Sequence, residues 1–396
     1  MFLLTKKIKN KRSYMFCLKY GALLLLFVFA FLQFALILRH KSPYISDSYF
    51  YKHLFYQMRG DSYDQAREKV VSQLNIDQLD KIGKKIFGDE ESYKYSYSFF
   101  TKRPLYPFLA LLFNKLGFNE FLSFLTPVFL AYAGSILLSF YQFRLGLSYF
   151  QAIFALALLI AFYPFLDWST YFLTDTIGFF FWLLQLIFAY KFVTAGTLKY
   201  LALYVISIGI SLLNREQSIL MLPLTVTLYL FVVIFKDSQI LKNRLAILIK
   251  STLAIVLFYL AITIIFNQRT IAESINYLQN DYAFFSKTFN LSETAGYLIK
   301  TIIFTHIVFL IDLARHHWWF TFVVLGLIGV TRMIIFSGKK QFINLLLLSS
   351  GLASYSFVFI YPVLSYRFFY PVVIMIVYFF VKFIFEFFEE RQKLIK

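Results

Sequence analysis

Residues 16–38 read FCLKYGALLLLFVFAFLQFALIL, an apolar run long enough to cross a bilayer as one helix. The run is too long for the apolar core of a secretory signal, and no small-x-small cleavage site follows it. Its amino-terminal side is basic and carries no acidic residue, with Lys6, Lys7, Lys9, Lys11, Arg12 and Lys19. The positive-inside rule therefore predicts a retained transmembrane helix with its amino terminus in the cytoplasm.

The composition of the whole chain agrees with a membrane protein. Of 396 residues, 60% are hydrophobic and 15% are charged, whereas soluble domains average about 45–50% apolar and about 25% charged residues. The net charge of +18 comes mainly from Lys and Arg at the ends of apolar runs. Retention on the cytoplasmic side and contact with anionic head groups explain this charge better than binding to nucleic acid. The single cysteine, Cys17, excludes an intramolecular disulfide.

Further apolar runs predict an all-α, polytopic bundle of about ten (nine to eleven) spans, folded as one integral membrane domain over residues 1–396. Residues 39–103 form a long first outer loop with surface helices, and Pro104–Leu116 is too short to span. The expected spans after the first are Phe121–Phe143, Tyr149–Leu166, Ile177–Val193, Tyr200–Leu213, Ile219–Phe235, Leu245–Phe266, Trp318–Phe336, Phe342–Tyr361 and Phe368–Phe388.

Two segments of the outer loops are apolar at helical spacing. Within the first loop, Val70 to Ile86 predicts an amphipathic helix on the membrane surface or across the outer mouth. Within a second outer loop, 267–317, Leu298–Leu313 is either a span or a re-entrant or surface helix. The second interpretation is favoured because it keeps Lys339 and Lys340, and the basic carboxyl terminus, in the cytoplasm.

Charged residues at the outer ends of the spans are the candidate site. Charges at membrane depth are costly and usually face a cavity or a partner, and Arg215 lies in a very short turn between apolar runs. A snorkelling arginine, or a local pair with Glu216, would also explain it. The other candidates have simpler interpretations too: Asp47 as a solvated loop acid, Asp175 as a helix cap, and Arg103 and Arg367 as interface anchors.

Metal and nucleotide sites find little support. The adjacent His316 and His317 point to different faces of a helix, and His306 stands alone, so no convergent ligand set is visible. No glycine-rich phosphate loop is present. We therefore predict no metal bound by histidine and no cofactor, although a divalent cation stays possible.

Taken in order, the outer motifs resemble those of GT-C glycosyltransferases. These are membrane enzymes that take a sugar from a polyprenyl-phosphate carrier on the outer face, as mannosyltransferases and aminoarabinose transferases do. The resembling pieces are Asp47 with Tyr49 and Tyr51 soon after the first helix, Arg103-Pro104-Leu105-Tyr106-Pro107 closing the loop, Arg215 in a later hairpin, and Tyr366-Arg367 ahead of Pro371. Asp47 lacks the second adjacent acid of many members, which leaves metal dependence open.

The resemblance implies an inverting sugar transfer to a glycan, lipid or protein acceptor. A carboxylate can take the acceptor proton, which favours Asp47 as the general base. Arginine matches phosphate oxygens, which favours binding of the carrier by cationic residues. The expected substrate-binding residues are Arg103, Arg215, Arg367, Tyr366, Tyr49 and Asp175. The usage of Phe, Tyr, Lys, Ile and Asn points to a bacterial plasma membrane.

Two other functions share the same helices. A transporter or lipid-linked glycan flippase would predict inverted repeats and charges near the bilayer midplane, and neither is visible. A polymerase or ligase of surface polysaccharide would share the lipid-linked substrate but would place its arginines in late outer loops. The identity of the sugar and of the acceptor is not encoded in any motif that we recognise.

Overall fold

The computed structural model of the chain describes residues 2–235, 238–270, 273–275, 277, 291–336, 341–361 and 365–395. Every regular element in this part of the chain is a helix, which confirms the all-α fold. Nine of its helices are long and apolar enough to cross a membrane. They are α1 (Phe2–His40), α7 (Glu120–Arg144), α10 (Asp175–Ala195), η2 with α12 (Glu216–Leu220, Met221–Ile234), α13 (Gln239–Ile265), α15 (Leu291–Arg315), α16 (His317–Phe336), α17 (Phe342–Ile360) and α18 (Tyr370–Ile395).

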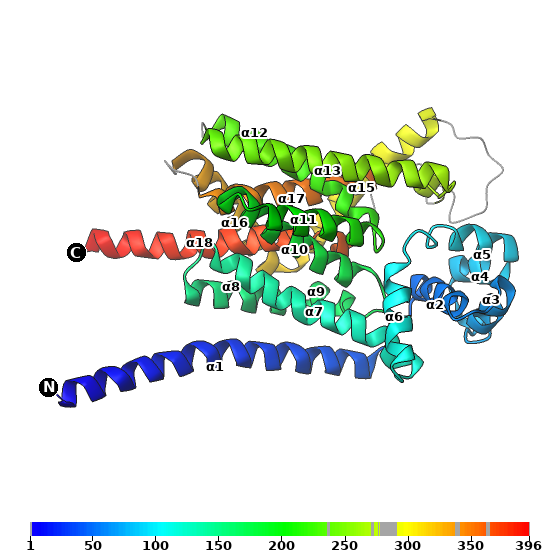
Figure 1. Ribbon diagram of the computed structural model, residues 1–396, viewed down its shortest axis with the longest axis horizontal. Helices are drawn as coiled ribbons and strands as arrows, with labels where there is room; N and C mark the ends of the chain where they lie inside the picture. The colour runs from blue at the N-terminus through cyan, green and yellow to red at the C-terminus, as the bar shows by residue number, and fades with distance from the viewer. Residues whose placement is uncertain are drawn as a thin grey trace.

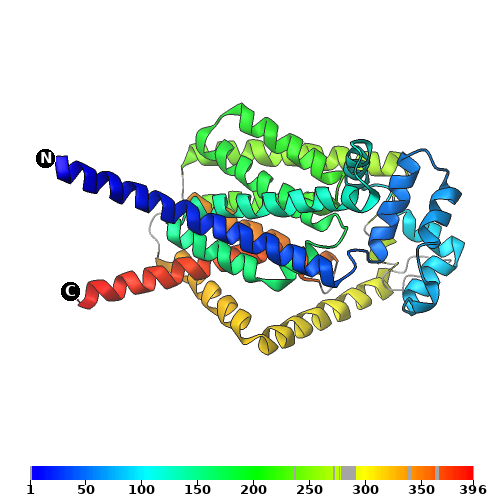
Figure 2. The ribbon, with the colours of Figure 1, turned by 90° about the horizontal axis from the view of Figure 1, so that it is seen from below.

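Two further expected spans are shorter helices that run beside the long ones (Figures 1 and 2). α8 (Tyr149–Ala161) is capped by Phe162, and α9 (Tyr163–Trp168) follows at once with Pro164 in its first turn. The break follows from proline, which removes a backbone donor and clashes with the preceding turn. α11 (Leu198–Leu212) has 15 residues and is about 22 Å long at the helical rise, so it needs its flanking turns to reach both faces.

Both termini lie at one end of the bundle, and the first outer loop lies at the other (Figures 1 and 2). α6 (Leu105–Lys115) runs across the bundle axis between the spans and that loop (Figure 1), in agreement with a segment too short to span. Its exposed side chains are the apolar Phe108 and Leu112 and, in the last turn, Lys115. α6 therefore has the character of a helix lying in the membrane interface.

The first outer loop folds into a small helical unit, here called the outer cap, made of α2 (Ser46–Met58), α3 (Tyr63–Val71), η1 (Ile76–Gln78), α4 (Lys81–Gly88) and α5 (Glu90–Tyr97). The single amphipathic helix predicted over Val70 to Ile86 is wrong, because this stretch is split into α3, η1 and α4. Asp80 caps α4 by accepting from the amide of Gly83, and a capping side chain starts a new helix. Val70 and Ile86 are nevertheless buried.

The outer cap has an aromatic core of its own that continues onto the bundle. Phe50 and Tyr93 are buried within the cap, and they belong to the same cluster as Phe124 of α7. His53 is fully buried beside them, and its Nδ1 lies 2.9 Å from the hydroxyl of Tyr93. Glu120, which opens α7, anchors the cap by an ion pair of 2.5 Å with Lys52 of α2. The cap is thus fixed over the outer ends of the spans.

α15 and α16 follow one another with almost no connection. Figure 2 shows them running in succession from the end with the outer cap to the end with the termini, with a sharp turn between them. Sequence favoured a re-entrant or surface helix over Leu298–Leu313, whereas α15 is long and apolar enough to cross a membrane by itself. Because α15 and α16 together cross from one end of the bundle to the other once, both termini still lie at the same end. Most of 267–290, and Lys339 and Lys340, lie outside the described residues.

A cluster of charges at the outer end of the bundle

Four candidate residues lie at helix ends that meet below the outer cap. Asp47 is in the first turn of α2, Asp175 opens α10, Arg215 follows α11, and Arg367 lies in η3 (Tyr366–Phe368). Hydrogen bonds to backbone carbonyls hold these ends together. They join Phe172 to the carbonyl of Pro43, Leu105 to the carbonyl of Leu213, and the Asn214 side chain to the carbonyl of Thr174.

Arg367 stands between the two candidate carboxylates. Its Nη1 lies 3.8 Å from Oδ2 of Asp47 and 3.5 Å from Oδ2 of Asp175. The other carboxylate oxygen of Asp175 accepts a hydrogen bond from Arg215. Asp175 is thus shared by two arginines and has a side chain only 3% exposed, whereas that of Asp47 is 35% exposed. The two acids have the same chemistry but very different access to a substrate.

A second group of charges adjoins the first through the backbone of residues 215 and 216. Nε and Nη2 of Arg103 each lie 3.1 Å from Oε2 of Glu216. Lys102 pairs with the other oxygen of the same carboxylate. The local pair of Arg215 with Glu216 that sequence offered as an alternative is therefore not formed, since each residue has its partners on other segments.

These seven side chains, Asp47, Asp175, Glu216, Lys102, Arg103, Arg215 and Arg367, are called the charge cluster below. Four cations against three carboxylates leave it with one net positive charge. Burial and the like charges of Arg367 and Arg103 lower the pKa of Arg215 to about 9, while Tyr51 and Glu216 work in the opposite direction. The excess of positive charge would be relieved by an anion bound among the arginines.

Aromatic rings support the two central arginines. The guanidinium of Arg367 lies 4.6 Å from the ring centre of Trp168, and that of Arg215 lies 4.6 Å from the ring centre of Phe368. Such stacking holds a guanidinium plane without using its N–H groups. Nε of Arg367 is buried and has no hydrogen-bond partner among the described residues. Arg367 therefore retains donor capacity that its two long contacts to carboxylates do not satisfy.

Two predicted residues do not belong to the charge cluster. The hydroxyl of Tyr366 donates to Asp312 near the end of α15, so it turns away from the neighbouring Arg367. The ring of Tyr49 packs on those of Tyr44 and Phe87 in the outer cap. No hydrogen bond joins Tyr49 or Tyr366 to Asp47 in the described part of the chain.

Sequence reasoning did not select Lys102, Glu216 or Trp168 as site residues. Lys102 is adjacent to the candidate Arg103, and Glu216 is adjacent to the candidate Arg215. This adjacency was the one feature of the sequence that could have indicated them. The sequence does not distinguish Trp168 from a tryptophan that merely lies at the membrane interface. No group of three or more His, Cys, Asp or Glu side chains able to hold a metal is found in the described part of the chain. The two outer acids instead face an arginine.

The sequence model of the dolichyl-phosphate-mannose-protein mannosyltransferase family matches residues 101–261 of this chain. Five residues of the charge cluster lie within the matched stretch, namely Lys102, Arg103, Asp175, Arg215 and Glu216, while Asp47 and Arg367 lie on either side of it. No curated protein matches the chain. The match confirms the resemblance to GT-C enzymes over these residues, and together with the helices it supports a membrane glycosyltransferase of that type.

Proposed function

We propose that this protein transfers a sugar from a polyprenyl-phosphate carrier to an acceptor hydroxyl at the end of the bundle that bears the outer cap. The acceptor oxygen attacks the anomeric carbon of the sugar and loses its proton to a carboxylate. The bond between that carbon and the phosphate oxygen breaks, and the carrier phosphate keeps the electron pair. A single displacement inverts the anomeric centre.

Asp47 is the proposed general base. A base must come within hydrogen-bonding reach of the acceptor hydroxyl, and Asp47 is the more exposed of the two outer acids. Its contact with Arg367 at 3.8 Å is too long for a hydrogen bond, so the carboxylate keeps its lone pairs for a substrate. Asp175 is too buried and too fully engaged by arginines for the same task.

Arg367 and Arg215 are the proposed ligands of the carrier phosphate. Cations aimed at the leaving group stabilise the charge that develops there, and Arg367 has unsatisfied donor capacity. Arg103 and Lys102 are tied to Glu216 and would contribute mainly through their field. Asp175 would orient the two central arginines by binding each with one oxygen. No step of this scheme requires a metal.

The proposed orientation places the termini in the cytoplasm and the charge cluster on the opposite side of a bacterial plasma membrane. Arg144 ends α7 and Lys199 lies in the first turn of α11, at the end that bears the termini. Arg244 of α13 donates to the carbonyls of Val193 and Thr194 at the carboxyl end of α10. Basic residues at helix ends on one side favour that side as cytoplasmic.

The test is transfer of a radiolabelled sugar from synthetic polyprenyl-phosphate donors by the purified chain in lipid nanodiscs. We expect Asp47→Asn to reduce kcat by a factor of about 10² to 10⁴, the range for loss of a general base, with little change in the KM of the donor. Asp64→Asn, at an exposed acid of α3, is the matched control. Unaltered kcat in Asp47→Asn would refute the assigned base. Movement of intact donor across the bilayer without transfer would favour the flippase alternative.

A further inference from the structure

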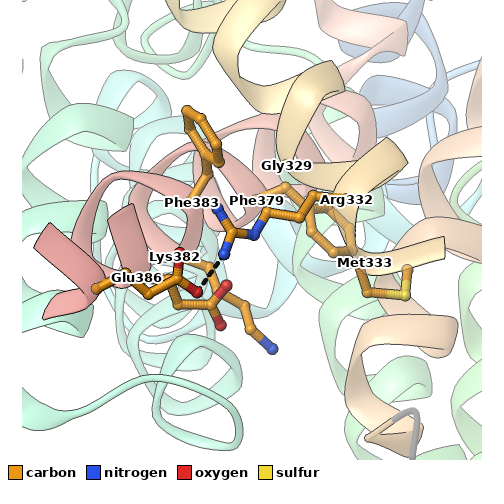
Figure 3. Close-up of a pocket in the computed structure, with 8 residues that line it drawn as sticks. Gly329, Arg332, Met333, Phe379, Lys382, Phe383 and Glu386 are labelled. Carbon is orange, nitrogen blue, oxygen red and sulfur yellow. Dashed lines mark hydrogen bonds and ion pairs between the residues drawn. The ribbon is translucent and has the colours of Figure 1, made fainter. Parts of the chain in front are cut away.

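A cavity lies far from the charge cluster, between α16 and α18 on the side of the termini (Figure 3). Its volume is about 220 Å³, and its apolar wall includes Phe379 and Phe383. The charged lining comes from Arg332 on α16 and from Lys382, Glu386 and Glu390 on α18. Nothing in the proposed sugar transfer uses these residues.

The cavity arises from the way the two helices separate. Gly326 and Gly329 allow α16 to lie directly on α18, because a Cβ at these positions would approach the carbonyl oxygens of Ile376 and Phe379 within 2.8 and 2.5 Å. After Gly329, the residue of α16 that faces α18 is Arg332, whose long side chain keeps the two helix backbones apart. α18 then continues past the rest of the bundle (Figures 1 and 2). The opening is therefore at the edge of the bundle.

The charges that line the cavity are only partly satisfied by each other. Arg332 reaches across to pair with Glu390 (Figure 3). Among the described residues, the Nζ of Lys382 has one oxygen partner, Oδ1 of Asn344 at 3.2 Å, which also accepts from the hydroxyl of Tyr378. Glu386 has no ion pair or hydrogen bond with any described residue. Lys382 and Glu386, a helical turn apart, thus line the same cavity and attract each other, but no ion pair or hydrogen bond joins them in the described chain.

We propose that this cavity binds the head group of a phospholipid that bears a primary amine, with its phosphate at Lys382 and Arg332 and its ammonium at Glu386. A purely anionic head group would leave the carboxylate unpaired, and unpaired ionised groups at membrane depth are costly. A quaternary amine has no N–H to donate. Only a head group with both a phosphate and a primary ammonium satisfies both sides.

The source of the ligand is the leaflet on the side of the termini. α16 exposes the apolar residues Leu327, Ile334 and Ile335, and α18 exposes Phe387 and Phe388. Acyl chains can pack along these surfaces while the head group occupies the cavity. A free phosphoamine would gain nothing from them, so the lipid is the expected occupant.

The test is native mass spectrometry of the full chain, released from nanodiscs that contain equal amounts of phosphatidylethanolamine, phosphatidylglycerol and phosphatidylcholine. We expect phosphatidylethanolamine to be retained about tenfold over each of the others, the order of magnitude for one or two hydrogen bonds to charged groups. Glu386→Gln should abolish the preference over phosphatidylglycerol. Lys382→Gln should weaken retention of all three lipids.

Matched controls lie on the same helix. Glu389 and Lys393 are exposed and do not line the cavity, so Glu389→Gln and Lys393→Gln should leave lipid retention unchanged. Equal retention of the three lipids by the unaltered protein would overturn the proposal, and this comparison needs no variant to fold. So would equal effects of Glu386→Gln and Glu389→Gln, or retention of soluble phosphoethanolamine as strong as that of the lipid.

Discussion

Arg215 pairs with Asp175, which opens the first helix of the α10–α11 hairpin that Arg215 follows, and not with the adjacent Glu216. The pair has side chains only 12% and 3% exposed. It joins the end of α11 to the start of α10, where Asn214 also donates to the carbonyl of Thr174. This pairing leaves Glu216 to Lys102 and Arg103, and so it decides which cations remain available to a phosphate.

Removing one member of this buried pair should be costly. We expect Asp175→Asn to lower the free energy of unfolding by about 3–5 kcal/mol, since an arginine would lose its buried counter-charge. The double variant Asp175→Asn, Arg215→Gln should be less destabilised than the sum of the two single variants. Denaturant titration of the protein in detergent measures all three. Strictly additive losses would show that the pair makes no energetic contribution of its own.

Arg367 should be sensitive even to a conservative exchange. Lysine keeps the charge but lacks the planar fork and the stacking on Trp168. We expect Arg367→Lys to lower kcat/KM for the polyprenyl-phosphate donor by a factor of about 10² to 10³, the loss typical of one preorganised donor. Arg315→Lys, at an exposed arginine that ends α15, serves as the control. A donor turnover equal to that of the control would remove Arg367 from the site.

Trp168 should act by holding Arg367 in place. A cation–π contact contributes about 0.5–2 kcal/mol, so we expect Trp168→Leu to lower kcat/KM by about twofold to thirtyfold and leave the pH dependence of kcat unchanged. The matched control is Trp318→Leu, because Trp318 is 79% exposed. If both variants lose activity to the same extent, the effect reflects anchoring in the membrane and not the arginine.

The outer cap should lose stability in mild acid. Burial, with Arg67 nearby, lowers the pKa of His53 to about 4, while the unfolded value is about 6.5. The unfolded state therefore binds more protons between these values, and stability falls as the pH drops from about 6.5 to about 4. Tyr63, Tyr93 and Tyr97 face the imidazole and stay neutral there.

Protonation of His53 should lower the free energy of unfolding by about 2 kcal/mol between pH 7 and pH 5. Thermal unfolding of the protein and of His53→Gln, followed at both pH values, measures it as the difference in their pH dependence. The variant should be less stable at pH 7 but should lose less on acidification. Parallel curves for the two proteins would mean that His53 is protonated without cost in the folded state.

The spans and the outer cap were predictable because each depends on local pattern. The first helix follows from an apolar run with a basic flank, and the surface position of α6 follows from a run too short to cross. The predicted helix over Val70 to Ile86 was wrong for a local reason as well. Its apolar spacing was real, but Asp80 provides a cap that starts a new helix, and capping outweighs weak periodicity.

The partners within the site were less predictable. Asp47, Asp175, Arg215 and Arg367 could be selected because charge is rare at membrane depth. Which carboxylate each arginine would meet depends on how loops from distant helices meet, and no sequence pattern encodes that. Tyr366 shows the same limit, since it is adjacent to Arg367 yet its hydroxyl bonds to Asp312 of α15.

The contact of Arg367 with Asp47 also has a consequence for biosynthesis. The carboxylate belongs to the first helix after the amino-terminal span, and the arginine belongs to the turn before the last one. A ribosome that has not yet delivered α17 and α18 has made a chain with the proposed base Asp47 but with only one of the two proposed phosphate ligands, Arg215. On the proposed mechanism, a nascent chain would not consume the lipid-linked donor until α17 and the turn that follows it have joined the bundle.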